Sequence, residues 1–203
     1  MYASFGKVRS VFAKVGSVYT ECLTRSPYVT NCTTGFIVAT AGDVLCQKYM
    51  EDNKAASGAE SMSSLAEERR IDVRRALEMG LIRASIVTPF TQFWYGFLLR
   101  LAPGSVLKRV IIDQAIGSPL VIAMVFSAKG ILRLDLNASK DMITTNLVKT
   151  WITGLSYWPF VHAINFRFVP LMYQPTFATF ASLYWNAVQS YYANKDESEN
   201  LEQ

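Results

Sequence analysis

The chain has 203 residues, of which 51% are apolar and only 18% are charged, and its formal net charge is +4. A soluble domain is usually about one quarter charged, and one of this size could not hide so much apolar surface in a single core. The basic residues lie at the edges of apolar stretches and form no stripe with interleaved aromatic residues. Composition therefore disfavours nucleic-acid binding and favours an integral membrane protein with lipids as its partners.

Residues 1–25 predict a basic amphipathic N-terminal helix. Apolar residues recur there at helical spacing, and Lys7, Arg9 and Lys14 occur with no acidic residue before Glu21. The segment lacks the long apolar run and the cleavage site of a secretory signal. Two interpretations use the same physics and stay open, namely a mitochondrial targeting segment and a helix lying on the membrane surface.

Residues 26–194 predict an all-α membrane helical bundle of about four transmembrane helices. Few of its apolar runs reach twenty residues, so a soluble all-helical protein is the remaining alternative. The polar residues 51–72 predict an exposed loop, the residues after Pro170 are long enough for another helix, and residues 195–203 predict an acidic tail. The expected spans are Ser26–Tyr49, Ala76–Leu101, Val106–Leu134 and Leu147–Val169.

Small residues and prolines inside these spans predict how the helices pack. Gly35 and Gly42 lie on adjacent faces of the first span, where they let helix backbones approach closely. Pro89, Pro119 and Pro159 each fall inside a span and free a backbone carbonyl one turn earlier. Bent helices with spare carbonyls suit a pore wall, and they equally suit a tightly packed, inert bundle.

The most informative residues are ionisable side chains inside the expected spans. An ionised group deep in a bilayer costs several kcal/mol, so such groups face the bundle interior, pair with each other, or line a watery cavity. One interpretation is a polar route for small solutes. The other is a structural network in which acids of the first and third spans are neutralised by arginines of the second and fourth, and both can hold together. These residues are Asp43, Arg83, Asp113, Lys149 and Arg167.

No catalytic, cofactor-binding or metal site is predicted. An odd number of cysteines, with Cys32 and Cys46 on one expected helix, argues against a disulfide framework. His162 is the only histidine, and no nucleophile or acid stands near it in sequence, so a packing role between helices is expected. Since the chain also has no glycine-rich phosphate loop and no nucleophile elbow, it is not expected to be an enzyme.

An ordered set of short motifs extends over about residues 28–190. In chain order the motifs are Gly42-Asp43 with Gln47, Asp72-x-x-Arg75, Gly80, Pro89, Trp94-Tyr95, Asp113-Gln114, Pro119, Trp158-Pro159, Asn165-Phe166, Val169-Pro170-Leu171 and Trp185-Asn186. This set resembles the Mpv17/PMP22 family of small four-helix proteins of mitochondrial inner and peroxisomal membranes. The chain departs from the family pattern in the long loop 51–72 and at Thr88, Gln92, His162 and Gln174, where the family usually has glycine, histidine, glutamine and arginine.

The resemblance implies a channel-like protein for small solutes or metabolites, with diffusion through a water-filled path. An alternative is a non-conducting accessory or scaffold subunit of a large mitochondrial inner-membrane complex. The expected partners are accordingly a homo-oligomer or other subunits, and the expected location is the mitochondrial inner membrane, with the peroxisomal membrane as the alternative. Arg75 and Asp72 can instead cap the entrance at the membrane surface. The predicted pore-lining or buried polar network is Asp43, Arg75, Arg83, Asp113, Asn165 and Arg167.

Overall fold

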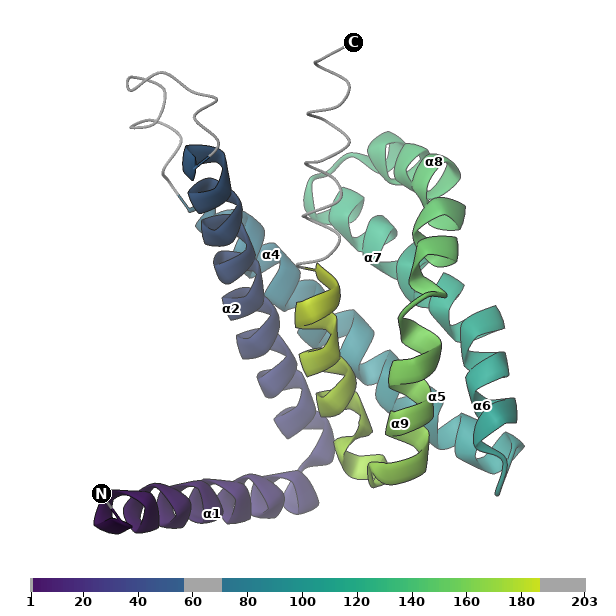
Figure 1. The fold of residues 1–203 in the computed structure, drawn as a ribbon. Helices are drawn as coiled ribbons and strands as arrows, with labels where there is room; N and C mark the ends of the chain where they lie inside the picture. The colour runs from purple at the N-terminus through teal and green to yellow at the C-terminus, as the bar shows by residue number, and fades with distance from the viewer. Residues whose placement is uncertain (1, 57–70, 187–203) are drawn as a thin grey trace.

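The computed structural model describes residues 2–56 and 71–186, and over these ranges it is built from helices without a strand (Figure 1). Most of the predicted polar loop 51–72 and the whole predicted tail 195–203 lie outside the described residues. The elements in chain order are α1 (Tyr2–Arg25), α2 (Pro27–Ala56), α4 (Val73–Ile82), η1 (Arg83–Val87), α5 (Thr88–Leu101), α6 (Val106–Ile112), η2 (Asp113–Gly117), α7 (Ser118–Leu132), α8 (Leu136–Gly154), α9 (Trp158–Phe168), η3 (Leu171–Tyr173) and a last helix at residues 174–186.

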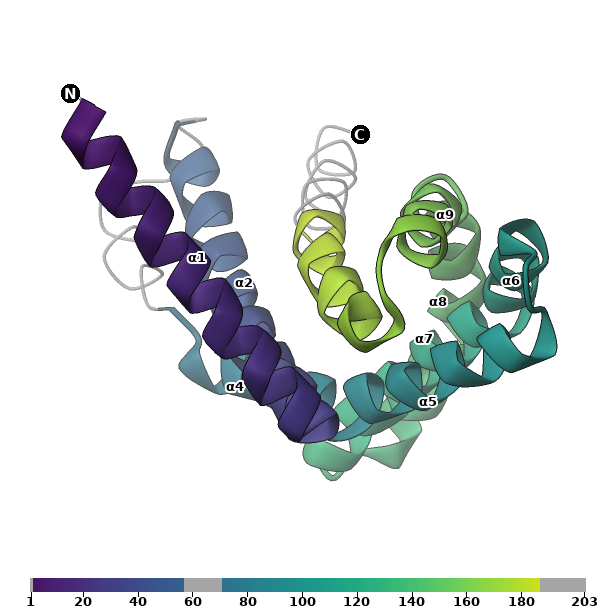
Figure 2. The ribbon, with the colours of Figure 1, turned by 90° about the horizontal axis from the view of Figure 1, so that it is seen from below.

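The helices run back and forth through a single bundle (Figure 1). The chain passes along α2, returns along α4, η1 and α5, passes again along α6, η2 and α7, and returns along α8 and α9. The last helix then runs in the same direction as α2 and lies between α2 and α9 in both views (Figures 1 and 2). This central position lets the last helix contact side chains from several other helices at once.

Two helical stretches of the described chain, Pro27–Tyr49 and Val106–Leu132, are long and apolar enough to cross a membrane. In each, only 22% of the most apolar window is buried by the rest of the protein. A core helix of a soluble protein would be mostly buried, whereas a lipid-facing helix keeps its apolar side chains on the outside. The predicted fold class, an all-α membrane bundle, is confirmed, and the number of about four crossings stays a prediction.

Two of the three interior prolines are accommodated inside continuous helices. The segments η1 and η2 are π-helical, and each is followed at the same spacing by a proline, Pro89 or Pro119. The N–H of Thr88 bonds to the carbonyl of Arg83 and that of Ser118 to the carbonyl of Asp113, five residues back. The wider turn absorbs the missing proline N–H and the clash of its ring with the preceding turn.

The third proline corresponds to a break, which corrects the predicted continuous span Leu147–Val169. Helix α8 ends at Gly154, a turn covers residues 155–157, and α9 begins at Trp158. Pro159 then lies in the first turn of α9, where its missing N–H would have no helical partner in any case. Helix α2 also corrects a boundary, because it continues to Ala56, past the predicted start of the polar loop.

Helix α1 runs crosswise to α2 rather than along it (Figure 1). Hydrogen bonds hold its C-terminal half on the bundle: the Tyr19 hydroxyl lies 2.7 Å from Thr176 Oγ1, and the Tyr173 hydroxyl donates to Thr20 Oγ1 at 2.8 Å. Thr176 in turn donates to the amide oxygen of the fully buried Asn31 in α2. A helix lying across the ends of membrane spans has the geometry expected of an amphipathic segment on the membrane surface.

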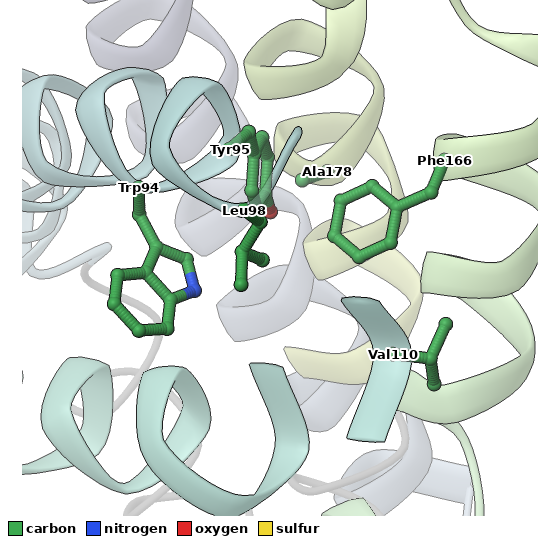
Figure 3. Close-up of a cluster of buried hydrophobic side chains, with 6 residues drawn as sticks. All are labelled: Trp94, Tyr95, Leu98, Val110, Phe166 and Ala178. Carbon is green, nitrogen blue, oxygen red and sulfur yellow. The ribbon is translucent and has the colours of Figure 1, made fainter. Parts of the chain in front are cut away.

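A cluster of buried apolar side chains joins α5, α6, α9 and the last helix (Figure 3). Close packing also occurs between α2 and η1, where a Cβ on Gly35 would lie 2.7 Å from Thr88 Oγ1. Any larger side chain there would push the two helices apart, so this small residue of the first span supports a close helix approach. The buried members of the cluster are Trp94, Tyr95, Leu98, Val110, Phe166 and Ala178.

Candidate functional site

A cavity of about 280 Å³ lies inside the bundle, and residues from η1, η2 and seven helices, including the last one, line it. Its lining extends from Asp113 and His162 to Met79 and Lys129. Much of the wall is aromatic, yet both π segments contribute a charged group, since Arg83 and Asp113 are among the lining residues. The cavity therefore holds two of the six residues of the predicted polar network.

Asp113 is the first residue of η2, and neutral groups hold its carboxylate. The Trp94 indole nitrogen donates to Oδ1 at 2.9 Å, and the Gln114 side-chain amide donates to Oδ2 at 2.9 Å. His162 Nδ1 lies 3.3 Å from Oδ2 but makes no hydrogen bond. Gly117 leaves the space for this arrangement, because a Cβ there would lie 2.9 Å from Asp113 Oδ1 and closer still to the indole nitrogen.

Arg83 is the first residue of η1, and its guanidinium contacts the last helix. One terminal nitrogen, Nη2, donates to the Ala178 carbonyl at 3.2 Å and to the Ser182 hydroxyl at 3.0 Å. The Nε atom is buried without a hydrogen-bond partner, and no carboxylate of the described residues lies within 4 Å of the guanidinium. Arg83 and Asp113 are thus each held by neutral groups rather than by each other.

The placement of both charges follows from the π segments. A π turn inserts one residue into the helix, so it rotates the side chains on either side relative to a regular α-helix. Arg83 and Asp113 occupy the same first position of their π segments, and both side chains line the same cavity. Wide turns of this kind occur frequently at functional sites.

A second polar cluster joins α2 to the start of α4. The Asp43 carboxylate is buried, pairs with the Arg75 guanidinium at 3.2 Å, and accepts from the Gln47 amide at 2.6 Å. Gln47 also binds the backbone of Asp72, whose side chain caps α4 by accepting from the Arg75 N–H at 2.9 Å. Neither Asp43 nor Arg75 lines the cavity. Asp43 is thus neutralised by an arginine, but by Arg75, which precedes the predicted second span, and not by Arg83 within it.

The two remaining predicted residues lie in α9 and in neither cluster. Asn165 is fully buried and donates to the Gln174 carbonyl at 3.2 Å, while Gln174 donates to the Val169 carbonyl, so both close the turn into the last helix. Arg167 is exposed, which corrects its assignment to a buried network. Helical spacing explains the difference, because His162, Asn165 and Phe166 share the inner face of α9 and position 167 points away from it.

Sequence reasoning missed two residues of the cavity. His162 was expected to pack between helices with no acid nearby, and it does contact the rings of Tyr95, Trp158 and Phe166, but it also faces Asp113. Asp113 stands out in the sequence, but nothing in the sequence indicates that it faces His162, which lies 49 positions later in the chain. Lys129 did give one, since it is the only charged residue between Asp113 and Arg133 in an otherwise apolar helix.

The chemistry available in the cavity is charge and hydrogen bonding. Within residues 2–56 and 71–186, no three His, Cys, Asp or Glu side chains are grouped closely enough to hold a metal ion. The ionisable lining groups are an arginine, a lysine, an aspartate, a histidine and a tyrosine, surrounded by indole and phenyl rings. Such an environment can accept a small hydrated or partly apolar solute.

Comparison with known proteins gives a consistent set of relatives. The model of the Mpv17/PMP22 family matches residues 131–190. PXMP2/4 family protein 1 of Dictyostelium discoideum is 27% identical over 94% of this chain and 90% of its own length. Mitochondrial inner membrane protein Mpv17 of Xenopus laevis is 27% identical over 87% of this chain and 96% of its own length, and Protein SYM1 of Mycosarcoma maydis is 24% identical over 82% and 80%. No solved structure matches the chain significantly.

Proposed function

Because the chain belongs to the Mpv17/PMP22 family of membrane proteins, we propose that it is a channel-like protein for small solutes or metabolites. The observation that carries the proposal is the cavity between the helices, with Arg83 and Asp113 in its wall. Solutes would diffuse through this space, and the width of the cavity and the charges of its wall would set selectivity.

The expected location, the mitochondrial inner membrane, agrees with the relatives. The Xenopus laevis protein, which aligns over 87% of this chain, is named a mitochondrial inner membrane protein. The basic helix α1 at the N-terminus has the composition that either a mitochondrial targeting segment or a surface-bound helix requires. We therefore propose that the chain is a membrane protein of the mitochondrial inner membrane, and the peroxisomal membrane is the alternative.

Buried charges in the cavity also support a solute path over an inert bundle. An inert bundle would gain stability by pairing Arg83 with an acid or by replacing it with an apolar residue. Here the guanidinium keeps a buried Nε–H without a partner, and the Arg83 side chain lines the cavity. A membrane protein retains such a costly group where the group contacts water or solute.

Reconstitution into planar bilayers tests this function with a matched pair of substitutions in α7. Ile122 lines the cavity, whereas Leu120 on the same helix is 42% exposed and does not line it. We expect the unmodified protein to conduct, Ile122→Trp to lose most of the conductance because the indole fills the cavity, and Leu120→Trp to conduct normally. Absence of conductance in the unmodified protein, or equal conductance in both variants, would count against a path through the cavity.

The second candidate is a non-conducting accessory subunit of a larger membrane complex. Gln174 favours it, because this neutral residue stands where the resemblance to the family implies an arginine, and its side chain closes the turn after α9. Gentle detergent extraction from native membranes separates the two functions. A small homo-oligomeric particle supports the channel, and a particle found only with stoichiometric amounts of other subunits supports the accessory role.

A further inference from the structure

We propose that the cavity binds a small anion, with its carboxylate or phosphate group held by the Arg83 guanidinium and the Lys129 ammonium. The proposal deepens the channel function by naming the class of solute. It rests on that function for the passage of the solute but not for its binding, so the two can be tested separately.

The first argument is the unfilled bonding capacity of Arg83. A guanidinium has five N–H donors and is always charged, and the described partners are two neutral oxygens on one terminal nitrogen. The Nε–H is buried, lacks an acceptor, and belongs to a side chain that lines the cavity. Nη1 also has no hydrogen bond to a described residue, but it is not fully enclosed, so an oxyanion in the cavity would give this charged group an acceptor.

The second argument is that Lys129 also lines the cavity and that its acidic neighbours are already paired. The carboxylates whose charges reach Lys129 are Asp43 and Glu78. Asp43 pairs with Arg75 at 3.2 Å, and Glu78 pairs with Arg74 at 3.0 Å and with Arg133 at 3.5 Å. No ion pair within 4 Å joins Lys129 to any acid of the described chain.

The third argument concerns Asp113, the one carboxylate among the described residues of the cavity wall. Its two oxygens accept from Trp94 and Gln114, so its charge is stabilised without help from Arg83 or Lys129. With His162 neutral, the lining side chains carry one positive charge in excess. The wall therefore has a cationic part that suits an oxyanion and a part around Asp113 and His162 that suits a hydroxyl or other donor of the same solute.

The size of the cavity limits the solute. Pockets for drug-sized ligands begin at about 300 Å³. A cavity of about 280 Å³ fits a small metabolite, and the indole rings of Trp94, Trp158 and Trp185 provide flat apolar surface for its carbon skeleton. The chemistry shared by the candidates is a compact oxyanion, whether a carboxylate or a phosphate.

Intrinsic tryptophan fluorescence tests binding directly, because three of the four tryptophans line the cavity. The full-length protein in detergent is titrated with succinate, with inorganic phosphate, and with the dication putrescine. We expect a saturable change with succinate, with phosphate or with both, and none with putrescine. The responding anion distinguishes a carboxylate site from a phosphate site.

Variants assign the response to the two cations. Arg83→Gln should weaken anion binding by about tenfold or more, and Lys129→Gln should weaken it by a smaller factor. Arg83→Lys, which keeps the charge, should retain part of the affinity and serves if Arg83→Gln does not fold. The control is Arg167→Gln, an arginine exposed on α9, which should bind as the unmodified protein does.

Three results would overturn the proposal: no saturable response to either anion from folded protein, an unchanged affinity in Arg83→Gln, or preferential binding of putrescine. Bilayer recordings keep its failure apart from that of the channel. Anion binding without conductance would reject the channel and keep the anion site. Conductance with cation selectivity and no anion binding would keep the channel and reject the anion site.

Discussion

Asp43 and Asp113 are both buried carboxylates in apolar helices, but their surroundings differ in one respect. Asp43 pairs with Arg75, whose side chain is 43% exposed, at the end of the bundle where α4 begins. Asp113 has no arginine or lysine partner among the described residues and is held by an indole and an amide. Asp43 is neutralised by an arginine, whereas Asp113 makes no ion pair with Arg83, the cation of the same cavity.

This difference separates a structural role from a functional one. The Asp43 carboxylate pairs with Arg75 and accepts from Gln47, which links α2 to the cap of α4, so this cluster stabilises the fold. The cavity cluster keeps buried atoms without hydrogen-bond partners on Arg83 and His162, and both side chains line the cavity. A buried charge is therefore best interpreted by asking what its opposite charge contacts.

The largest expected effect is on stability, from Asp43→Asn. The substitution leaves Arg75 without its carboxylate and breaks the contact that orients Gln47, so we expect a loss of about 2–3 kcal/mol. The value is below the usual range for a fully buried pair because Arg75 reaches solvent. Unfolding of the purified protein in mixed micelles, followed by tryptophan fluorescence, measures the change.

The control for this prediction is Arg74→Gln, which removes the neighbouring pair with Glu78. The Arg74 side chain is 78% exposed, so its loss should cost no more than about 0.5 kcal/mol. Equal losses of stability in the two variants would mean that the Asp43 cluster has no special structural role. The structural difference drawn between Asp43 and Asp113 would then be wrong.

The sequence was sufficient for the fold class, but it did not predict which side chains pair within either cluster. Apolar runs with charges at their ends predict membrane helices, and Asp43 was expected to meet an arginine inside the second span. Its partner in the structure is Arg75, which precedes that span. The sequence signals are local or follow from composition. The cavity contact between Asp113 and His162 is neither, because it depends on how α9 packs against η2.

The prolines mark the other limit of prediction. Pro89, Pro119 and Pro159 look alike in sequence, yet two follow π segments within continuous helices and the third begins a new helix. Local sequence fixes only that each proline lacks a donor and clashes with the preceding turn. Whether the helix widens or breaks depends on the packing of its neighbours. The π segments bring Arg83 and Asp113 into one cavity, so the cavity could not be predicted from the sequence either.

The next largest effect tests the packing that holds Asp113. Gly117→Ala places a methyl group against the Trp94 indole and the Asp113 carboxylate, so we expect a loss of stability of about 1–3 kcal/mol. The matched control is Gly96→Ala in α5, where no atom lies within 4 Å of the new Cβ. That variant should be neutral or slightly stabilised, because alanine favours helix more than glycine does. Thermal unfolding in the same detergent compares the two variants, and similar losses would contradict the role assigned to Gly117.

Asp113→Asn should change selectivity more than stability. The asparagine oxygen can still accept from Trp94, so the loss of stability should stay near 1 kcal/mol, the value of a typical hydrogen bond. Removing the negative charge leaves Arg83 and Lys129 unopposed in the wall, so reversal potentials in a salt gradient should move toward anion permeation. Arg83→Gln should move them in the opposite direction. Shifts of the same sign in both variants would show that these charges act on conduction only through the fold.

The smallest effect is expected from Arg167→Gln. Arg167 belongs neither to the Asp43 cluster nor to the cavity, so this variant tests whether only the charges of the cavity wall affect conduction. Arg167 belongs to the same predicted network as Asp113, but the helical spacing of α9 directs it away from His162 and Asn165. Its charge should therefore change neither the stability nor the reversal potential beyond experimental error, although α9 contributes directly to the cavity wall. A clear shift of the reversal potential, measured beside Arg83→Gln in the same bilayers, would mean that Arg167 reaches the solute path in the conducting state. In that case selectivity would be set by charge in α9 as a whole, and the distinction between paired and available charges would no longer explain the site.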